Sequence, residues 1–221
     1  MISDPASSMS EKLRFALECC QSLGSLKETP DSLRGYLAPI EGVALMLLAQ
    51  HFPGEGTVVE IGSFLGKSTC WLALGAKAGE RGLVHAVDWF KPLSHMAESD
   101  DPADRACVAA GSTFPLFESH VRRFGVHDQV RAMVMDSVSA AAAWPGTPIR
   151  LLFIDGHHEY ESVKRDFESW QGYVPEGGLI AFHDYGPSWP GVVRFYDETM
   201  AASSDYEEVL QCRSLRVVAK R

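Results

Sequence analysis

The feature that most constrains the fold of this 221-residue chain is a regular alternation of short apolar runs with helical stretches. Because these runs are apolar almost throughout, they are typical of strands buried on both faces of a parallel sheet. Right-handed crossovers through helices link such strands. We expect seven strands, at residues 57–61, 83–88, 130–135, 150–154, 178–182, 206–210 and 215–219. The sequence therefore predicts an α/β fold with a seven-stranded, mostly parallel sheet and helices on both faces.

The residues before the first strand are predicted to be helical. One helix is expected over residues 11–26 and another over residues 39–48, where apolar side chains are too dense for a surface helix. We interpret residues 1–54 as an N-terminal helical cover and residues 55–221 as the body of the same domain, since a chain of this length commonly buries one core. Between Trp89 and Gln129 the sequence is less regular, and we expect a mobile lid there, with an acidic stretch at residues 98–104 before a helix over residues 114–124.

Composition argues against several classes of partner. The chain has 20 basic and 29 acidic residues and a net charge of -9, which repels nucleic-acid phosphates and anionic lipids. The longest apolar run, residues 43–49, is far too short to span a bilayer. The five cysteines form no C-x-x-C pair, which fits a reducing compartment. We therefore expect a cytoplasmic protein without a nucleic-acid or membrane partner, and the apolar residues 43–48 leave a homo-oligomer open.

A glycine-bearing turn follows the first expected strand, with the sequence Glu60-Ile-Gly62-Ser-Phe-Leu-Gly66-Lys-Ser68. A phosphate-binding Walker A loop needs four residues between its first glycine and the Gly-Lys-Ser, and here there are three. A dinucleotide fingerprint needs a second glycine two positions after Gly62, where Phe64 stands instead. What remains is E-x-G-x-x-x-G, which suits a ligand without phosphates, because Gly62 lets the backbone lie close against it.

Acidic residues close three successive strands. Glu60, Asp88 and Asp136 stand at the ends of the first, second and third expected strands. Ligands of parallel α/β sheets bind beyond the carboxyl ends of the strands, so these side chains are expected to share one edge. Each has a structural interpretation as well, because a carboxylate can simply cap a helix or hold a turn. Their joint occurrence at successive strand ends favours a ligand site.

This arrangement resembles motif I and the following strand ends of class I S-adenosylmethionine-dependent methyltransferases, whose sheet is Rossmann-like. The resemblance implies that turn groups bind the methionine part of S-adenosylmethionine, that Asp88 binds the ribose hydroxyls and that Asp136 contacts the adenine. The expected cofactor-binding residues are Glu60, Gly62, Ser63, Gly66, Lys67, Ser68, Asp88, Trp89, Asp136, Ser137 and Asp155.

The most specific stretch comprises Asp155-Gly-His157-His158-Glu-Tyr and, further on, Gly-Gly-Leu-Ile-Ala-Phe-His183-Asp184-Tyr. It resembles the macrocin O-methyltransferase and cephalosporin hydroxylase-like proteins, and the resemblance covers about residues 55–185. In that family acidic residues at these strand ends hold a divalent cation, usually magnesium, which implies Asp155, His183 and Asp184 here. Because an imidazole replaces a carboxylate at His183, zinc, iron, nickel or manganese fits the expected set better. A metal-free site, in which His183 hydrogen-bonds Asp155, stays open.

The resemblance implies O-methylation of a hydroxyl on a small molecule of the sugar or natural-product type. The sulfonium already activates the methyl group, so the protein must align the acceptor oxygen and remove its proton. His157 stands where many relatives carry an aspartate proposed as the base, and His157 or His158 is the expected catalytic residue here, although a structural role for His158 stays open. The alternatives are a metal-independent or N-methyltransferase, or a non-catalytic or metal-dependent hydroxylase-like protein of the same fold.

Overall fold

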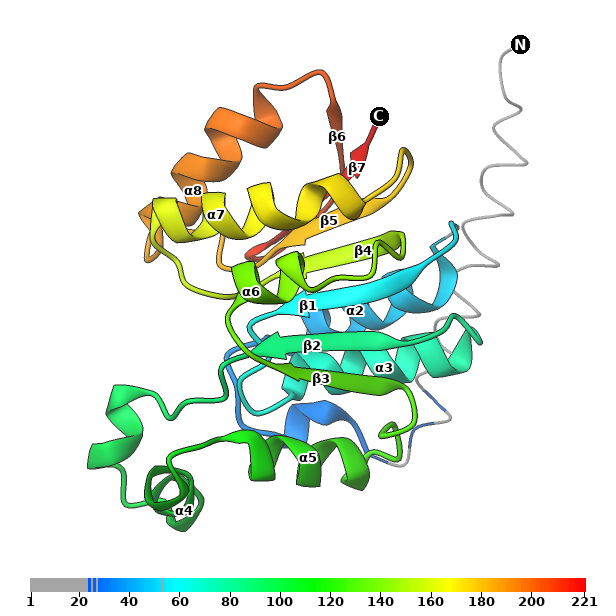
Figure 1. The fold of residues 1–221 in the computed structure, drawn as a ribbon. Helices are drawn as coiled ribbons and strands as arrows, with labels where there is room; N and C mark the ends of the chain where they lie inside the picture. The colour runs from blue at the N-terminus through cyan, green and yellow to red at the C-terminus, as the bar shows by residue number, and fades with distance from the viewer. Residues whose placement is uncertain (1–23, 25, 27, 53) are drawn as a thin grey trace.

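A single seven-stranded sheet forms the centre of the molecule (Figure 1). The computed structural model describes residues 24, 26, 28–52 and 54–221, so the helix expected over residues 11–26 lies almost wholly outside the described part. The strands are β1 (Thr57–Ile61), β2 (Val84–Asp88), β3 (Val130–Val134), β4 (Ile149–Ile154), β5 (Leu179–Phe182), β6 (Tyr206–Cys212) and β7 (Leu215–Lys220). Their order in the sheet is β3-β2-β1-β4-β5-β7-β6.

Strands β1 to β5 run parallel, and β7 runs antiparallel to both β5 and β6. This confirms the predicted fold class, a mostly parallel sheet in the Rossmann-like arrangement. The strand order reverses direction between β1 and β4, which is the switch point where ligands of such sheets bind. Register places Glu60 of β1 beside Ala86 of β2 and Phe153 of β4, so Glu60 lies in the middle of the sheet.

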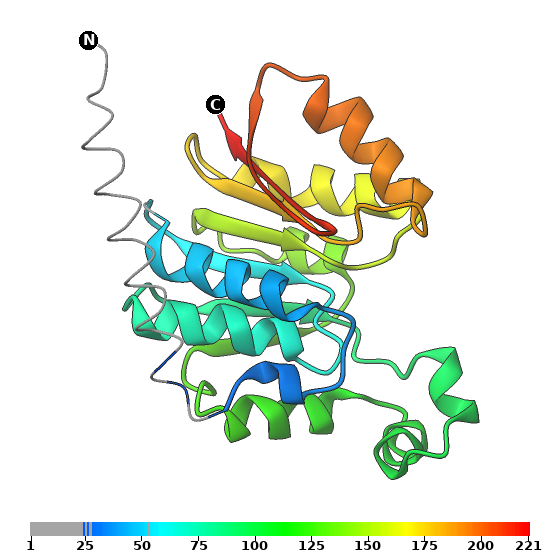
Figure 2. The same ribbon diagram turned by 180° about the vertical axis from the view of Figure 1, so that it is seen from behind.

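Helices cover both faces of the sheet, as Figures 1 and 2 show from opposite sides. The helices are α2 (Pro39–His51), α3 (Lys67–Ala78), α4 (Pro102–Ala110), α5 (Phe114–Arg123), α6 (Ser137–Ala142), α7 (Tyr160–Trp170) and α8 (Pro190–Tyr196). Successive strand residues point to opposite faces. Val58 therefore joins the apolar core under α2, α3 and α5, whereas Val59 joins the core under α6, α7 and α8.

Helix α2 packs directly on α3 and so contributes to the cover of one face. The two helices approach so closely that a Cβ at Gly75 would lie 2.0 Å from the carbonyl oxygen of Met46. A Cβ at Gly42 would lie 2.2 Å from the indole nitrogen of Trp71. Any larger residue at either glycine would force the helices apart, because packed interiors leave no room for an added methyl group.

The segment between β2 and α5 lies beyond the edge of the sheet in both views. It contains a 3-10 turn, η2 (Ser94–Glu98), and helix α4, so the irregular region expected as a lid includes regular structure. Arg34, in the segment before α2, donates from Nη1 to Oδ2 of the buried Asp104 on α4 at 2.6 Å. Among the described helices, none has the length and apolar character needed to cross a bilayer.

Candidate active site

The expected site residues meet at the carboxyl edge of the parallel strands. The turns after β1, β2 and β5 are tight, since Phe64, Phe90 and Asp184 all adopt positive φ angles, of 45°, 52° and 62°. Residues other than glycine rarely adopt this conformation, and where they do the surrounding structure must hold them. The concentration of such residues at one sheet edge marks this edge as the candidate functional site.

The turn after β1 depends on Gly62, which has a φ of 86°. Its amide donates to the carbonyl of Val87 at 2.9 Å, which ties the turn to β2. A Cβ at this position would lie 2.1 Å from the carbonyl oxygen of Asp155, so only glycine allows the turn to lie against the end of β4. Gly66, with a φ of 87°, then begins helix α3. The glycine turn thus lies directly beside the Asp155 segment.

Glu60 lies beneath this turn and is completely buried. Its Oε2 accepts hydrogen bonds from the hydroxyl groups of Ser63, at 2.9 Å, and Thr69. Its Oε1 is buried without a hydrogen-bond partner. Burial raises the pKa of Glu60 to about 7, even though the hydroxyls of Ser63, Ser68 and Thr69 counteract this effect. Glu60 Oε1 is therefore a buried acceptor beside the turn that has no partner among the described residues. A cation of a ligand placed next to it would be stabilised.

Asp88 has a structural role in addition to the ribose-binding role that we expected for it. Its Oδ2 accepts from the backbone amides of Ser63 and Phe64, both at 2.8 Å, and its Oδ1 accepts from the amide of Phe90 at 2.6 Å. These bonds join the glycine turn to the end of β2. A carboxylate has about four acceptor positions in all, so little of its capacity is left for the two expected ribose hydroxyls.

The remaining expected cofactor residues are spread along the same edge. Asp136 caps α6, because it accepts from the amide of Ser139 at 2.9 Å. Ser137 is largely buried, and its hydroxyl accepts from the indole nitrogen of Trp170 at 2.9 Å. Lys67 points to Asp31, with 3.6 Å between Nζ and Oδ1. Asp136 thus shows the capping role that the sequence left open, and Lys67 is paired outside the turn.

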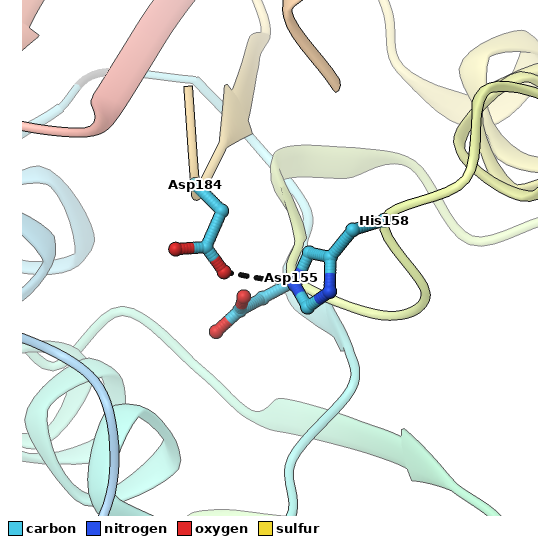
Figure 3. A group of neighbouring side chains, drawn as sticks. All are labelled: Asp155, His158 and Asp184. Carbon is cyan, nitrogen blue, oxygen red and sulfur yellow. Dashed lines mark ion pairs between the residues drawn. The ribbon is translucent and has the colours of Figure 1, made fainter. Parts of the chain in front are cut away.

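Three side chains converge where β4 and β5 end (Figure 3). Asp155, His158 and Asp184 each offer one atom to a group whose atoms lie within 4.8 Å of one another. His158 Nε2 lies 2.8 Å from Asp184 Oδ2, but it is buried without the geometry of a hydrogen bond. An imidazole nitrogen and carboxylate oxygens that converge in this way form a donor set that suits a divalent cation.

His183, which we expected to be a metal ligand, lies directly beside this group. Its ring is 3% exposed and lies between Glu41, 3.3 Å from Nε2, and the two aspartates, with Nδ1 3.2 Å from Asp155 Oδ1 and 3.3 Å from Asp184 Oδ2. Burial by itself would lower the pKa of His183, but Asp155, Asp184 and Glu41 together raise it to about 12. His183 Nδ1 thus lies close to both aspartates, and His158 places a second imidazole beside Asp184.

The two aspartates have different protonation preferences. Burial raises the pKa of Asp155, and the nearby Asp184 adds to this, although His183 acts in the opposite direction. Burial would also raise the pKa of Asp184, but the imidazoles of His158 and His183 close beside it hold that pKa well below its ordinary value. Asp184 is thus the firmly ionised member of the pair, and the charge of His183 stabilises both.

Glu41 and Ser214 are site residues that the sequence analysis did not identify. Glu41 Oε1 accepts from the backbone amide of Ser214 at 2.8 Å and from its hydroxyl at 2.7 Å, while Oε2 lies 3.3 Å from His183 Nε2. Glu41 is 2% exposed and stands in the otherwise apolar stretch 39–49 of helix α2, far from the other site residues in sequence. The sequence signal that could have identified Glu41 is an acidic residue within an apolar helical stretch.

Aromatic side chains surround this edge. Trp189 stacks on His158 with 4.0 Å between ring centroids, and Trp89 meets His157 edge to face at 6.2 Å. Lys91 Nζ lies 5.1 Å from the centroid of the Trp89 ring. His157 is exposed at the rim, whereas His158 faces the aspartates. The two candidate bases therefore occupy different surroundings.

Comparisons with solved structures agree with this fold. An O-methyltransferase from Bacillus cereus, solved in complex with SAH, shows 22% identity and a TM-score of 0.59, over 94% of this chain and 91% of that one. TomG, an O-methyltransferase from Streptomyces achromogenes involved in tomaymycin synthesis and solved with SAM, shows 18% identity and a TM-score of 0.58, over 93% and 89%. CalS11, a TDP-rhamnose 3'-O-methyltransferase of calicheamicin biosynthesis, shows 16% identity and a TM-score of 0.56, over 99% and 96%.

Sequence comparison identifies the family. A curated relative, an uncharacterized protein of Acanthamoeba polyphaga mimivirus, is 35% identical over 66 residues, which are 30% of this chain and only 26% of that protein. The model of the family Methyltransf_24, described as a methyltransferase domain, matches residues 59–185, which is more than half of the chain and includes both the glycine turn and the Asp155–Asp184 region. The chain therefore belongs to this methyltransferase family, as expected for a class I S-adenosylmethionine-dependent methyltransferase.

Proposed function

We propose that the protein transfers a methyl group from S-adenosylmethionine to a hydroxyl oxygen of a small molecule. The observation that carries the proposal is the position of the Asp155, His158 and Asp184 group directly beside the glycine turn. The glycine turn is suited to binding a cofactor, and the Asp155, His158 and Asp184 group is suited to holding an acceptor and removing its proton. The O-methyltransferases TomG and CalS11, which share the fold, act on oxygen according to their descriptions and support the same reaction class.

The residues around the glycine turn fit S-adenosylmethionine. The unpartnered Oε1 of Glu60 is a buried carboxyl acceptor, and the methionine ammonium is a cation of the kind that would satisfy it and favour its ionised form. Asp88 holds the turn that would approach the cofactor, and Asp136 and Ser137 begin α6 farther along the same edge. When bound, the cofactor supplies a methyl group activated by the sulfonium. The chain's own residues then have to orient the acceptor and accept its proton.

The Asp155, His158 and Asp184 group fits a divalent cation, and its mixed nitrogen and oxygen donors suit manganese, iron, nickel or zinc better than magnesium. A cation there would lower the pKa of an acceptor hydroxyl. His157 is then the better candidate for the general base, because it is exposed at the rim and separate from the donor group. In a metal-free site His158, oriented by Asp184, would take that role.

Cofactor binding is tested by calorimetry with S-adenosylmethionine on the full chain. The Asp88→Asn variant, which keeps one acceptor oxygen but loses the charge, is expected to bind at least about tenfold more weakly. Asp128→Asn serves as a matched control, because the Asp128 side chain is 81% exposed in the loop before β3. Failure of the wild-type protein to bind S-adenosylmethionine would contradict the proposed function.

The donor group is tested separately with manganese and magnesium. Protein freed of metal with a chelator is titrated with each ion. Manganese is expected to bind more tightly than magnesium, and His158→Gln is expected to remove most of this preference. His127→Gln is the control, since the His127 side chain is 50% exposed and its Nε2 lies 3.3 Å from Oδ1 of the neighbouring, 81% exposed Asp128. If chelation leaves methyl transfer unchanged, the metal-free mechanism is correct instead, and His158 is the residue whose loss should then abolish turnover.

A further inference from the structure

The chain leaves the sheet after β2 and returns to it beside the point where it left. The amide of Thr113 donates to the carbonyl of Phe90 at 2.8 Å, so residues 91–112 form a closed excursion, which we call the lid segment. The buried ring of Phe90 packs against Phe114 and Phe117 of α5, with 5.0 and 4.8 Å between ring centroids. The base of the lid segment is thus fixed to the core, whereas its elements η2 and α4 project away from the sheet (Figures 1 and 2).

Helix α4 of the lid segment packs loosely on the body of the protein. A hollow of about 250 Å³ lies between α4 and α5, and its walls are small or apolar side chains, among them Ala103, Ala106, Pro115 and Leu116. The link between the two helices is open as well, since a Cβ added at Gly111 would meet nothing within 4 Å. Side chains that line a hollow make few attractive contacts across it, so packing alone holds α4 weakly.

Polar contacts attach the lid segment to residues that precede α2. Arg34 donates from Nη1 to Asp104 Oδ2 at 2.6 Å and from Nη2 to Asp104 Oδ1, which makes a bidentate pair. Asp104 is 2% exposed, whereas the Arg34 side chain is 40% exposed. The hydroxyl of Tyr36 lies 3.3 Å from Nε2 of His95 in η2. Because a buried carboxylate without its partner is costly, the Arg34–Asp104 pair is the attachment whose loss should matter most.

The same stretch of chain also contacts the glycine turn. We call residues 31–37 the strap. Asp31 Oδ1 lies 3.6 Å from Nζ of Lys67, the first residue of α3, and the ring of Tyr36 stacks on Phe64 with 6.1 Å between centroids and 25° between planes. Tyr36 therefore touches both the glycine turn, through its ring, and the lid segment, through its hydroxyl. The strap thus joins the position of the lid segment to the state of the turn.

We propose that the Arg34–Asp104 pair is a latch: the lid segment is closed against the strap while the pair is made and opens as a unit when the pair breaks. The lid segment starts close to Asp88 at the end of β2, so its opening changes access to the cofactor part of the site. A ligand that binds one of two forms more tightly shifts the protein toward that form. S-adenosylmethionine held by the glycine turn therefore favours the closed form through Tyr36 and the strap. This last step rests on the proposed function, whereas the latch itself does not.

The latch is tested by hydrogen–deuterium exchange of the ligand-free full chain, followed by mass spectrometry. Arg34→Gln and Asp104→Asn are each expected to speed exchange in peptides from η2 and α4 at least about tenfold, and to leave peptides from β1 and β4 as in the wild type. Arg105→Gln is the matched control on α4, because the Arg105 side chain is 59% exposed and lies 3.6 Å from the fully exposed Asp100. Unchanged exchange in α4 for the two latch variants, or faster exchange that extends to the core strands, overturns the inference.

The coupling to the glycine turn is tested on the same samples with saturating S-adenosylmethionine. The cofactor is expected to slow exchange of η2 and α4 in the wild type by at least about threefold and to have little effect on them in Arg34→Gln. Equal protection of the two proteins overturns the coupling. Calorimetry keeps the questions apart, because a wild type that does not bind S-adenosylmethionine contradicts the proposed function, and the ligand-free exchange then still decides on the latch.

Discussion

Replacing Glu60 by glutamine tests whether its carboxylate is kept for ligand binding at a cost in stability. The carboxyl group is completely buried, and burial raises its pKa from 4.5 to about 7. The unfolded chain has the ordinary value, so the folded protein binds more protons between these two pH values. The free energy of unfolding therefore falls as the pH rises from 4.5 to 7, and the stabilisation present at lower pH is lost above that window.

The magnitude follows from the two pKa values. A change from 4.5 to about 7, at about 1.4 kcal/mol for each pH unit, corresponds to about 3 kcal/mol. A glutamine side chain carries no charge at any pH, and its carbonyl oxygen still accepts from Ser63 and Thr69. The Glu60→Gln variant is therefore expected to match the wild type within about 1 kcal/mol near pH 4.5, and to be about 3 kcal/mol more stable at pH 8.

The assay is urea unfolding of the ligand-free protein at several pH values between 4.5 and 8, with Glu176→Gln at an exposed position as the control. If Glu60 accepts the ammonium of S-adenosylmethionine as proposed, calorimetry on the same variant should show weaker binding, because the glutamine carries no charge. Parallel curves of stability against pH for the wild type and Glu60→Gln would refute the reasoning, since they would mean that Glu60 is not a source of destabilisation at neutral pH.

Three further predictions concern the frame of the site. Gly62→Ala is expected to lower the free energy of unfolding by more than about 3 kcal/mol, because the φ at this position is 86° and the new Cβ would lie 2.1 Å from a carbonyl oxygen. Gly82→Ala, where φ is 83° but nothing lies within 4 Å, should lower it by about 1 kcal/mol. Denaturant unfolding of both variants separates the steric clash from the backbone strain. Burial would raise the pKa of Glu41, but its hydrogen bonds lower it from 4.5 to about 2, so it stabilises the fold above pH 4.5 and this contribution is lost as the pH falls to 2. Glu41→Gln should thus be about 3 kcal/mol less stable at pH 7 and equal to the wild type near pH 2, and acid unfolding curves that coincide throughout would contradict this. Trp170→Phe leaves Ser137 without its indole donor and opens a gap in the core, for an expected loss of about 2 kcal/mol by thermal unfolding; an unchanged melting temperature would show that the contact adds nothing.

Most of the sheet could be predicted from the sequence because its central strands are buried on both faces. The run at residues 57–61 coincides with β1, and the other four parallel strands differ from the expected ranges by about one residue at either end. Helix α4 was not predicted, since it is short, directly follows the acidic stretch 98–101, and has a face of mostly small alanine side chains that gives a weak apolar signal. Asp101 followed by Pro102 was nevertheless a readable start signal, because Asp101 accepts from the amide of Ala103 as an N-cap does.

The site could be predicted only as far as the strand ends determine it. Because parallel strands share a carboxyl edge, the sequence placed Glu60, Asp88 and Asp155 at that edge, as the structure shows. How the histidines would lie around the aspartates could not be read in this way. His183 contacts Glu41, 142 residues away, through Nε2 while its Nδ1 lies beside both aspartates, and no local pattern reports a contact of that range. His158 also lies beside Asp184, because the loop after β4 folds back toward β5.

The hydrogen bonds between Ser214 and Glu41 have a consequence for the order of assembly. Ser214 lies in the turn between β6 and β7, 173 residues after Glu41. During synthesis the glycine turn, Asp88 and Asp155 leave the ribosome well before the last hairpin exists. Contacts of such long range are also slow to form when a whole chain refolds. A nascent chain should therefore complete its glycine turn first. The buried contacts of Glu41 with His183 and Ser214 should form only when the final hairpin docks.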